Sequence, residues 1–559
     1  MGFLVFSRFH AAQLALCLLL LGRIAAGYSI FSATYDEHAH IGRGMLWLET
    51  GIYEDDGFQM PLPRLFFAIP PHLAGYTVKG SWLVNDWTNQ TAQDYWRSLT
   101  LARAGNLPFV IALFVGVAAF SRRMFGEKVS LAASAALACC PNVIGHGGLA
   151  TLDIGGTAGF FLGMFAFWHW RQRPGLGRTV LAGFVFGVAE ISKFSSAAFL
   201  ALPILFAVWK GARAERISWG RLAAHAACFG CVAFLTIWAG YALDVWEVNS
   251  YRHATAAREG RTVLPAADLL QEVRLPAPKF WRGFVDMAYL QQEGFPAFLN
   301  GEIRRHGWWH YFPTALVLKG SPPLLLLGVL GFFCLWRKGG REREAAVFLA
   351  VAFFGILAVS TPSTLNIGIR HVLPLFPILC VLGAGAFAPS LSRRRWVSLA
   401  ACALLGWHAV ESLMAHPNYL AYFNPAFRQQ DYRYLSDSNL DWGQDRARLG
   451  EWLAANESKD VCALAMQAGD ILKLYPTPPG SVESSEWVVL TTNQWALIQF
   501  DEGQREETRE MFRREPWGRI GRSMLIFHFP ERAKREPDAA AGEDGANARP
   551  EPGFVAEIL

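Results

Sequence analysis

Charged residues are scarce in this sequence. Asp, Glu, Lys and Arg make up 17% of its 559 residues, whereas hydrophobic residues make up 52%. A soluble enzyme of this length would usually carry about 25% charged residues. The apolar residues fall in long blocks rich in Phe and Trp. This distribution argues against a soluble enzyme and predicts a polytopic α-helical membrane protein.

Cysteine is nearly absent from the polar parts of the chain. Of nine cysteines, only Cys462 lies in a long polar segment, so no disulfide framework is predicted there. The net charge of +5 is small, and we expect no nucleic-acid partner. The sequence also lacks a clear internal repeat, which a transporter built from repeated halves would show.

The apolar blocks predict about eleven spans, since a helix needs roughly 17–25 apolar residues to cross a bilayer. We place them at 11–31, 99–120, 129–146, 154–170, 179–192, 195–209, 222–243, 321–336, 345–361, 372–390 and 397–415. The first block also resembles a signal peptide, with Ala25 and Ala26 near its end. We favour an uncleaved first helix because many spans follow.

Basic residues gather in every second loop between these spans. The loops contain Arg122, Arg123 and Lys128; Arg171, Arg173 and Arg178; Lys210, Arg213, Arg216 and Arg221; Arg337, Lys338, Arg341 and Arg343; and Arg393 to Arg395. This alternation is typical of cytoplasmic loops. We therefore expect a bacterial inner-membrane protein with a cytoplasmic N-terminus and with its other loops on the periplasmic side.

Three regions follow from this topology. Residues 1–415 would form the transmembrane catalytic domain, with long outer loops at 32–98 and 244–320. Residues 416–531 contain short strand-like and helix-like segments, which predict a small periplasmic α/β domain. Residues 532–559 are rich in Ala, Glu, Pro and Gly and are expected to be disordered.

Two aromatic segments lie in the long outer loops. They are "MPLPRLFFAIPPHLAGY" and "FLNGEIRRHGWWHYFP". Both suit amphipathic helices in the membrane interface, where Trp and Tyr are enriched. They equally suit ordinary loop helices packed on the bundle.

Carboxylates and cations gather at helix ends on the predicted outer face. The set is Asp36, Glu37, Asp153, Lys193, Lys319, Arg370 and His371. Placing an ionisable group near hydrocarbon costs roughly 2.5–3.5 kcal/mol, so such a group usually faces a cavity or a partner. Lys193 or Lys319 alone would suit a snorkelling side chain. A carboxylate cannot snorkel far, so Asp36 and Asp153 favour a general base or a cation site.

Several motifs around these residues resemble one enzyme family. The motifs are "DEHAHIGRG", "HGGLATLD", "ISKFSS", "GWWHYFP…LKGSPP", "NIGIRHVLPLFP" and "YFNPA…LSDSNLDWGQD". Their order and spacing are similar to those of the bacterial relatives of the protein O-mannosyltransferases, which are GT-C glycosyltransferases of family 39. The resemblance covers about residues 30–450. One departure is "MPLP" where many relatives have His-Pro-Pro-Leu.

The resemblance implies a GT-C-like fold, a polyprenyl-phosphate-sugar donor and chemistry on the outer membrane face. It places the catalytic acid of the first outer loop at Asp36, beside Glu37, and that of the second outer turn at Asp153. Cations would bind the donor phosphate, which carries the developing charge of the leaving group. The predicted set is Arg370, His371, Lys193 and Lys319. Asp36 would take the acceptor's proton, in a single displacement with inversion at the sugar.

Some questions stay open at this stage. His38 and His40 could bind a divalent metal together with Asp36 and Asp153, or they could be polar interfacial residues or acceptor contacts. The acceptor could be a protein, a glycan or a lipid. Arg23 and Glu190 lie within predicted spans and keep a lipid or sugar transporter or flippase as the alternative function.

The acidic stretch "SDSNLDWGQD" invites comparison with a calcium loop. It lacks the Gly and the distal Glu that an EF-hand requires. We therefore interpret it as a turn that docks the C-terminal domain onto the bundle.

Overall fold

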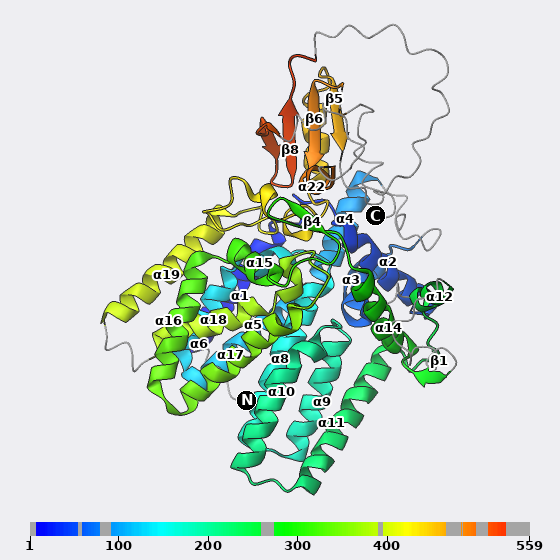
Figure 1. Ribbon diagram of the computed structural model, residues 1–559. Helices are drawn as coiled ribbons and strands as arrows, with labels where there is room; N and C mark the ends of the chain where they lie inside the picture. Colours follow the sequence, from blue (N-terminus) through cyan, green and yellow to red (C-terminus); the bar gives the residue numbers. More distant parts are fainter. Residues whose placement is uncertain are drawn as a thin grey trace.

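The computed structural model describes residues 7–53, 59–78, 91–258, 273–388, 395–464, 482, 484–498 and 513–532 (Figure 1). The predicted disordered tail lies outside these residues from position 533 onward, as do Arg393 and Arg394. The helices of the first half are α1 (Arg8–Ala25), α2 (Tyr35–Thr50), α3 (Pro61–Leu73), α4 (Ala92–Ala104), α5 (Leu107–Phe125), α6 (Glu127–Ala138), α7 (Pro141–Gly147), α8 (Leu152–Gln172), α9 (Leu176–Glu190), α10 (Ser196–Ala214) and α11 (Trp219–Gly240).

The second half alternates short strands with helices before it ends in a small sheet. Its elements are β1 (Val245–Glu247), α12 (Tyr251–Arg258), β2 (Arg274–Pro276), α14 (Pro278–Glu293), β3 (Ala297–Leu299), β4 (Glu302–Arg304), α15 (Tyr311–Lys319), α16 (Pro322–Lys338), α17 (Gly340–Ser360), η1 (Ile369–Val372), α18 (Leu375–Ala384), η2 (Gly385–Phe387), α19 (Arg395–Met414), η3 (Asp431–Arg433), η4 (Asp437–Asn439), α20 (Arg446–Ala454), β5 (Val461–Leu464), β6 (Trp487–Thr491), α22 (Thr492–Ile498), β7 (Gly518–Ile520) and β8 (Met524–His528).

All eleven predicted spans coincide with helical segments. Six helices of the described chain are long and apolar enough to cross a membrane, and up to eight if each of two bent pairs is one span. The bent pairs are α6 with α7, at 62°, and α15 with α16, at 108°. The three predicted spans that are not among these eight correspond to α8, α9 and α18. Helix α9 has 15 residues and α18 has 10, which at about 1.5 Å per residue are shorter than the hydrocarbon core, and α8 carries Asp153 in its first turn and ends in polar residues.

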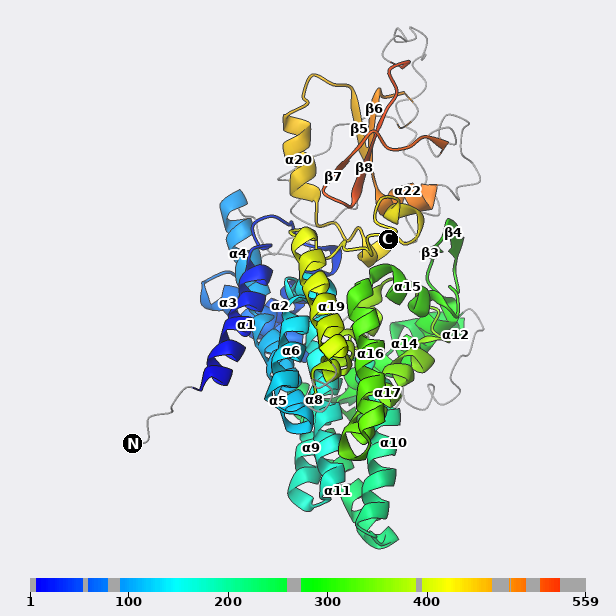
Figure 2. The same cartoon turned by 90° about the vertical axis from the view of Figure 1, so that its left-hand side faces the viewer.

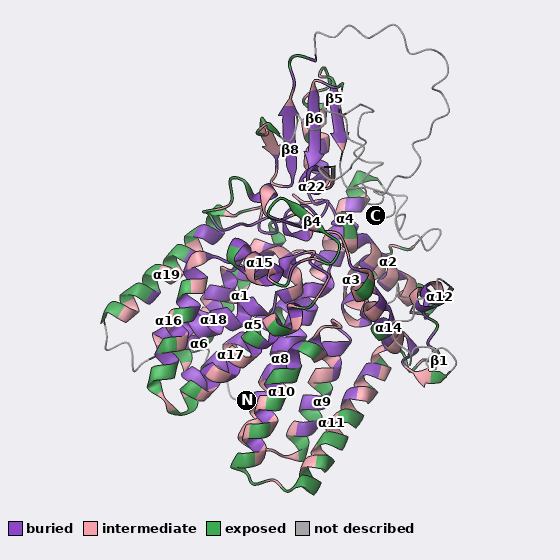
Figure 3. Ribbon diagram, in the orientation of Figure 1, coloured by how far each residue is buried: buried purple, intermediate pink, exposed green. Residues whose placement is uncertain are grey.

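Burial divides these helices into inner and outer sets. All ten residues of α18 are buried, whereas α11 buries only Ala233 and Ile237 (Figure 3). Helix α16 packs against α18 through Gly331, where a Cβ would lie 1.9 Å from the Leu382 carbonyl oxygen. Such close approach at a small residue is typical of helix contacts in membranes. The exposed apolar face of α11 suits contact with lipid.

Helix α3 confirms a helix in the first aromatic segment. It packs tightly on its neighbours, because a Cβ at Gly44 of α2 would lie 2.2 Å from the Arg64 carbonyl oxygen. A Cβ at Gly105, between α4 and α5, would lie 2.1 Å from the Phe66 carbonyl oxygen. Arg64 and Phe67 are fully buried. The helix is therefore wedged between α2 and the α4–α5 junction.

The second aromatic segment differs from the predicted interfacial helix. Its first part is an antiparallel hairpin of β3 and β4, in which Leu299 pairs with Glu302. The turn residues Asn300 and Gly301 have φ angles of 52° and 85°, and an Asn-Gly pair favours such turns strongly. Only the end of the segment is helical, as the start of α15.

The C-terminal region contains the small α/β unit that the sequence predicts. Its sheet has the order β5-β6-β8-β7, with β5 and β6 parallel and the other pairs antiparallel. The unit stands at one end of the helical bundle, and the α10–α11 turn lies at the opposite end (Figures 1 and 2). The candidate site described next lies at the bundle end that faces the sheet.

Candidate active site

Asp36 lies in the first turn of α2, which follows the end of the first apolar helix. Its Oδ2 accepts a hydrogen bond from the Arg370 guanidinium at 2.8 Å. The Asp36 side chain keeps 24% of its surface exposed, and that of Arg370 keeps 14%. The two residues are 334 positions apart in sequence. The contact thus joins the two helix ends that the sequence predicts at one face.

Glu37, the other predicted acid of this turn, is in a different position. Its carboxylate forms a two-pronged pair with Arg103, with both distances 2.9 Å, and accepts the N–H groups of Thr34 and Ala150 at 2.8 Å. Burial opposes ionisation, but the Arg103 charge and these hydrogen bonds hold the pKa of Glu37 below its ordinary value. The side chain is fully buried, so the carboxylate ties α2 to α4 and does not reach a substrate.

Arg370 is the centre of the cluster. It lies on the short helix η1, and its guanidinium carbon is 4.2 Å from the centroid of the Trp442 ring. Stacking on an aromatic face and a forked donor geometry are features that favour arginine over lysine. Burial would lower the pKa of Arg370, but the charges of Asp36, Asp153 and Asp437 raise it above its ordinary value. The guanidinium therefore stays charged and lies over the ring.

Lys193 connects the second predicted carboxylate to this centre. Its Nζ lies 2.5 Å from Oδ1 of Asp153 and 3.3 Å from the Arg370 carbonyl oxygen. The Lys193 side chain crosses α8 at Gly156, where a Cβ would lie 2.4 Å from the lysine Cβ. Asp153 is 3% exposed and Lys193 is 19% exposed. The ammonium group thus remains accessible while its counter-ion is enclosed.

Two histidines flank the cluster. His146, on α7, has its Nδ1 3.9 Å from Asp153 Oδ2, and its ring is 6.2 Å from the Trp442 ring. His371 follows Arg370, and its Nε2 has no hydrogen-bond partner among the described residues. Enclosure, followed by the charges of Arg370 and Lys193, lowers the pKa of His371 well below its ordinary value. A neutral His371 can therefore donate or accept one hydrogen bond.

The predicted metal ligands are not brought together. His38 is buried with Arg103 and Glu37 nearby, and burial lowers its pKa to about 4. His40 accepts a hydrogen bond from the Arg64 guanidinium at 3.2 Å. In the described part of the chain, no three His, Cys, Asp or Glu side chains are grouped as a metal site would require. The described residues therefore do not form the metal site that the sequence left open.

Lys319, predicted to bind phosphate, is instead fully buried. Its ammonium donates to the carbonyl oxygens of Leu420 and Asn439, at 2.9 and 2.5 Å. The bond to Asn439 ties α15 to the loop of residues 436–445, which we call the site loop. The site loop is the stretch "SDSNLDWGQD" and carries Trp442 to Arg370. These contacts support the prediction that the site loop docks the C-terminal domain onto the bundle.

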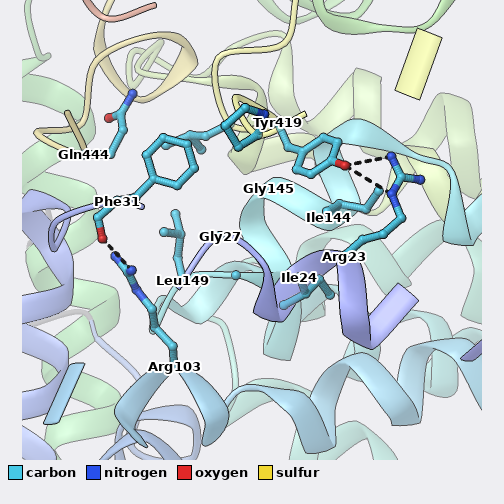
Figure 4. Close-up of a pocket in the computed structure, with 13 residues that line it drawn as sticks. Arg23, Ile24, Gly27, Phe31, Arg103, Ile144, Gly145, Leu149, Tyr419 and Gln444 are labelled. Carbon is cyan, nitrogen blue, oxygen red and sulfur yellow. Dashed lines mark hydrogen bonds between the residues drawn. The ribbon is translucent and has the colours of Figure 1, made fainter. Parts of the chain in front are cut away.

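A separate recess, small and partly open to solvent, lies beside the cluster (Figure 4). Leu149 and Leu420 line it and also pack against Trp442. Arg23 lies at one side and bonds to the Tyr419 hydroxyl, at 2.9 and 3.1 Å. Arg103 lies at another side and bonds to the Phe31 carbonyl oxygen at 2.7 Å. The two cations of the recess are thus engaged by the protein itself.

The structure adds three residues to the predicted set. They are Trp442, His146 and Asp437. Trp442 and Asp437 lie in the acidic stretch that the sequence presents as a docking turn, and His146 is the first residue of "HGGLATLD", at the end of the predicted span 129–146. The sequence analysis did not single out Trp442; the signal that could have found it is an aromatic residue inside an acidic turn, because a cation can stack on its face.

No family model matches this chain, and no curated protein sequence matches it. The solved structures similar to it include ArnT from Cupriavidus metallidurans, in one structure bound to undecaprenyl phosphate and in one in the apo state. For each, the identity is 12%, the match covers 92% of this chain and 97% of that chain, and the TM-score is 0.46. An identity of 12% and a TM-score of 0.46 give no evidence for the chemistry of this chain.

Proposed function

We propose that this chain is an inverting glycosyltransferase that moves a sugar from a polyprenyl-phosphate-linked donor to an acceptor. The observation that carries the proposal is the alternation of charges in the cluster. Asp36 contacts Arg370, whose carbonyl contacts Lys193, which contacts Asp153. Two partly exposed cations beside a partly exposed carboxylate suit a phosphate ester and a nucleophile that must lose a proton.

In the proposed reaction, the acceptor hydroxyl oxygen attacks the anomeric carbon of the donor sugar. The bond from that carbon to the phosphate oxygen breaks, and polyprenyl phosphate leaves with the bonding electrons. Arg370 and Lys193 stabilise the negative charge that develops on the leaving phosphate. The carboxylate of Asp36 takes the hydroxyl proton. Attack from the face opposite the phosphate inverts the configuration of the sugar.

The contact between Asp36 and Arg370 fits this sequence of events. A charge-assisted hydrogen bond at 2.8 Å stabilises the carboxylate and makes it a weaker base. A donor phosphate that takes over the guanidinium would remove this bond. Asp36 would then become a stronger base only when the donor is in place. Asp153 would stay on Lys193 and hold the ammonium in position.

The proposal includes a location. The site end of the bundle and the α/β unit of residues 416–531 would face the periplasm, and the basic loops the cytoplasm of a bacterial inner membrane. Reporter fusions after Arg123, Arg216 and Arg343 should report the cytoplasm. A fusion after Asn456 should report the opposite side, and a cytoplasmic signal there would reject this orientation.

The deciding experiment uses the full chain in lipid nanodiscs with polyprenyl-phosphate pentoses and hexoses as probes. Mass spectrometry of co-purified lipid would select the sugar to test first. We expect saturable donor binding and release of polyprenyl phosphate when a protein, glycan or lipid acceptor is added. Failure to bind any such donor would overturn the proposal. Movement of the intact donor across a vesicle membrane, without transfer, would instead support a flippase.

A further inference from the structure

The site loop is held between two parts of the protein. On the bundle side, Asn439 accepts the Ile369 N–H at 3.0 Å and donates to the Tyr311 hydroxyl at 3.0 Å. Ser438 donates to the Ile367 carbonyl oxygen at 2.6 Å. These bonds fix the central residues of the loop directly beside Arg370. They leave the two ends of the acidic turn, at Asp437 and Asp441, to be held by something else.

On the other side of the loop, one side chain of the C-terminal unit bridges both ends of the acidic turn, while Ser523 donates to the Asp445 carboxylate at 2.8 Å. Asn493 Oδ1 accepts the backbone N–H of Asp437, and its Nδ2 donates to the Asp441 carbonyl oxygen at 3.1 Å. Asn493 is 6% exposed and lies in the first turn of α22, directly after β6. Strand β6 is an inner strand of the sheet, paired on both edges. The Asn493 side chain thus directly follows one of the two inner strands of the sheet.

The conformation of the loop needs this support. Asp437 has a φ of 56°, a left-handed conformation that a residue other than Gly adopts at a cost. Gly368, just before Arg370, packs so closely that a Cβ there would lie 2.2 Å from the Ser438 hydroxyl. Loop and η1 therefore cannot shift independently. The residue that follows the Asn493 bond to Asp441 is Trp442, on which Arg370 stacks.

We propose that Asn493 is a positioning residue of the site, through which the C-terminal α/β unit sets the place of Trp442 and hence of the Arg370 guanidinium. This inference rests on the proposed function only for what Arg370 binds. The unit would then be a structural part of the donor site, although it lies outside the bundle (Figure 2). Loss of the Asn493 bonds would let the loop move and would reduce donor affinity, without removing a group that touches the donor.

The test compares the full-length wild type with Asn493→Ala in nanodiscs by hydrogen exchange and by titration with polyprenyl-phosphate sugar. We expect exchange in residues 436–443 to rise by at least about tenfold while β6 and β8 keep their protection. Donor affinity should fall by roughly tenfold, since misplacement of a binding group by about 1 Å can cost about 100-fold. Asn456→Ala is the matched control, because Asn456 bonds only locally to the Trp452 carbonyl oxygen, at 2.7 Å.

The outcomes separate this inference from the proposed function. Unchanged loop exchange in Asn493→Ala would overturn the positioning role, whatever the donor result. A looser loop with unchanged donor affinity would overturn the link to Arg370. If the wild type binds no donor, the proposed function fails, and the exchange data alone still decide whether Asn493 holds the loop. If Asn493→Ala does not fold, Asn493→Asp, which keeps only the acceptor oxygen, should loosen Asp441 and Trp442 more than Asp437.

Discussion

Asp36 and Glu37 are neighbours in sequence and carry the same functional group, yet their surroundings differ. Glu37 accepts five hydrogen bonds and is fully buried beside Arg103. Asp36 accepts a bond from Arg370 and keeps about a quarter of its side chain exposed. Glu37 is enclosed together with Arg103, whereas Asp36 is partly exposed and can exchange Arg370 for another group. Under the proposed function, this difference gives Glu37 a structural role and leaves the chemistry to Asp36.

The comparison shows which property separates a structural ion pair from a reactive one. Both pairs join distant parts of the chain, and both have distances between 2.8 and 2.9 Å. What differs is whether a ligand can displace one partner without leaving a buried charge. Displacing Arg103 would leave Glu37 uncompensated, which is costly. Displacing Arg370 from Asp36 would leave a carboxylate that water or a hydroxyl group can reach.

The largest expected effect comes from Asp36→Asn. This change keeps size and hydrogen bonding but removes the proton acceptor, so transfer should fall by roughly 10²–10⁴-fold. Folding yield and donor binding should remain near those of the wild type. Single-turnover transfer in purified protein measures the effect. Near-normal turnover in a monodisperse sample would eliminate Asp36 as the base and pass the assignment to Asp153.

Glu37→Gln tests the other side of the comparison. Breaking a buried pair leaves Arg103 uncompensated and should cost about 3–5 kcal/mol of stability. The measurement is thermal unfolding of the detergent-solubilised protein, together with yield. The folded fraction should transfer sugar at a rate close to that of the wild type. A stable Glu37→Gln protein that lacks activity would reverse the roles of the two carboxylates.

Arg370→Lys sharpens the comparison because it keeps the positive charge but removes the forked N–H donors and the planar guanidinium that stacks on Trp442. A hydrogen bond to a charged group contributes about 1.5–3 kcal/mol, so donor affinity should fall by roughly 10- to 100-fold. Arg370→Ala should weaken binding further. Equilibrium titration with donor lipid measures both variants. An affinity equal to that of the wild type in Arg370→Ala would place the phosphate elsewhere.

The smallest effect concerns pH and the site loop. Burial raises the pKa of Asp437 and of Asp441 to about 6. Because the folded state binds these protons more tightly than the unfolded state, the loop should lose stability as pH rises from about 4 to 6, by on the order of 1 kcal/mol. Hydrogen exchange of residues 436–443, corrected for intrinsic rates, measures this change. Asp441→Asn should flatten the dependence, and an unchanged slope would contradict the assignment.

The helices and the general place of the site were predictable from sequence. Apolar runs fix where helices form, and the basic loops alternate, so the ends that bear Asp36, Asp153, Lys193 and Arg370 were expected at one face. The contact between Asp36 and Arg370 agrees with that expectation. Its atomic pairing was not predictable, because it depends on how the chain returns after more than three hundred residues.

Other features depend on local packing that periodicity does not encode. The aromatic segment before α15 has a helix-like pattern, but its Asn300–Gly301 turn makes a hairpin. Lys319 lies at a helix end like Lys193. It is enclosed by the site loop, however, and donates its hydrogen bonds to backbone carbonyl groups. The distinction between the two lysines arises only when the loop of residues 436–445 folds over one of them.

The order in which the site residues occur along the chain has a consequence for biogenesis. Asp36 leaves the ribosome early, Arg370 and Trp442 much later, and Asn493 close to the end. A chain under synthesis therefore holds its carboxylate long before it has the cation and the ring that complete the site. Under the proposed function, membrane insertion would therefore precede any use of donor lipid. A prematurely terminated product that lacks the last strands would insert into the membrane but would be inactive.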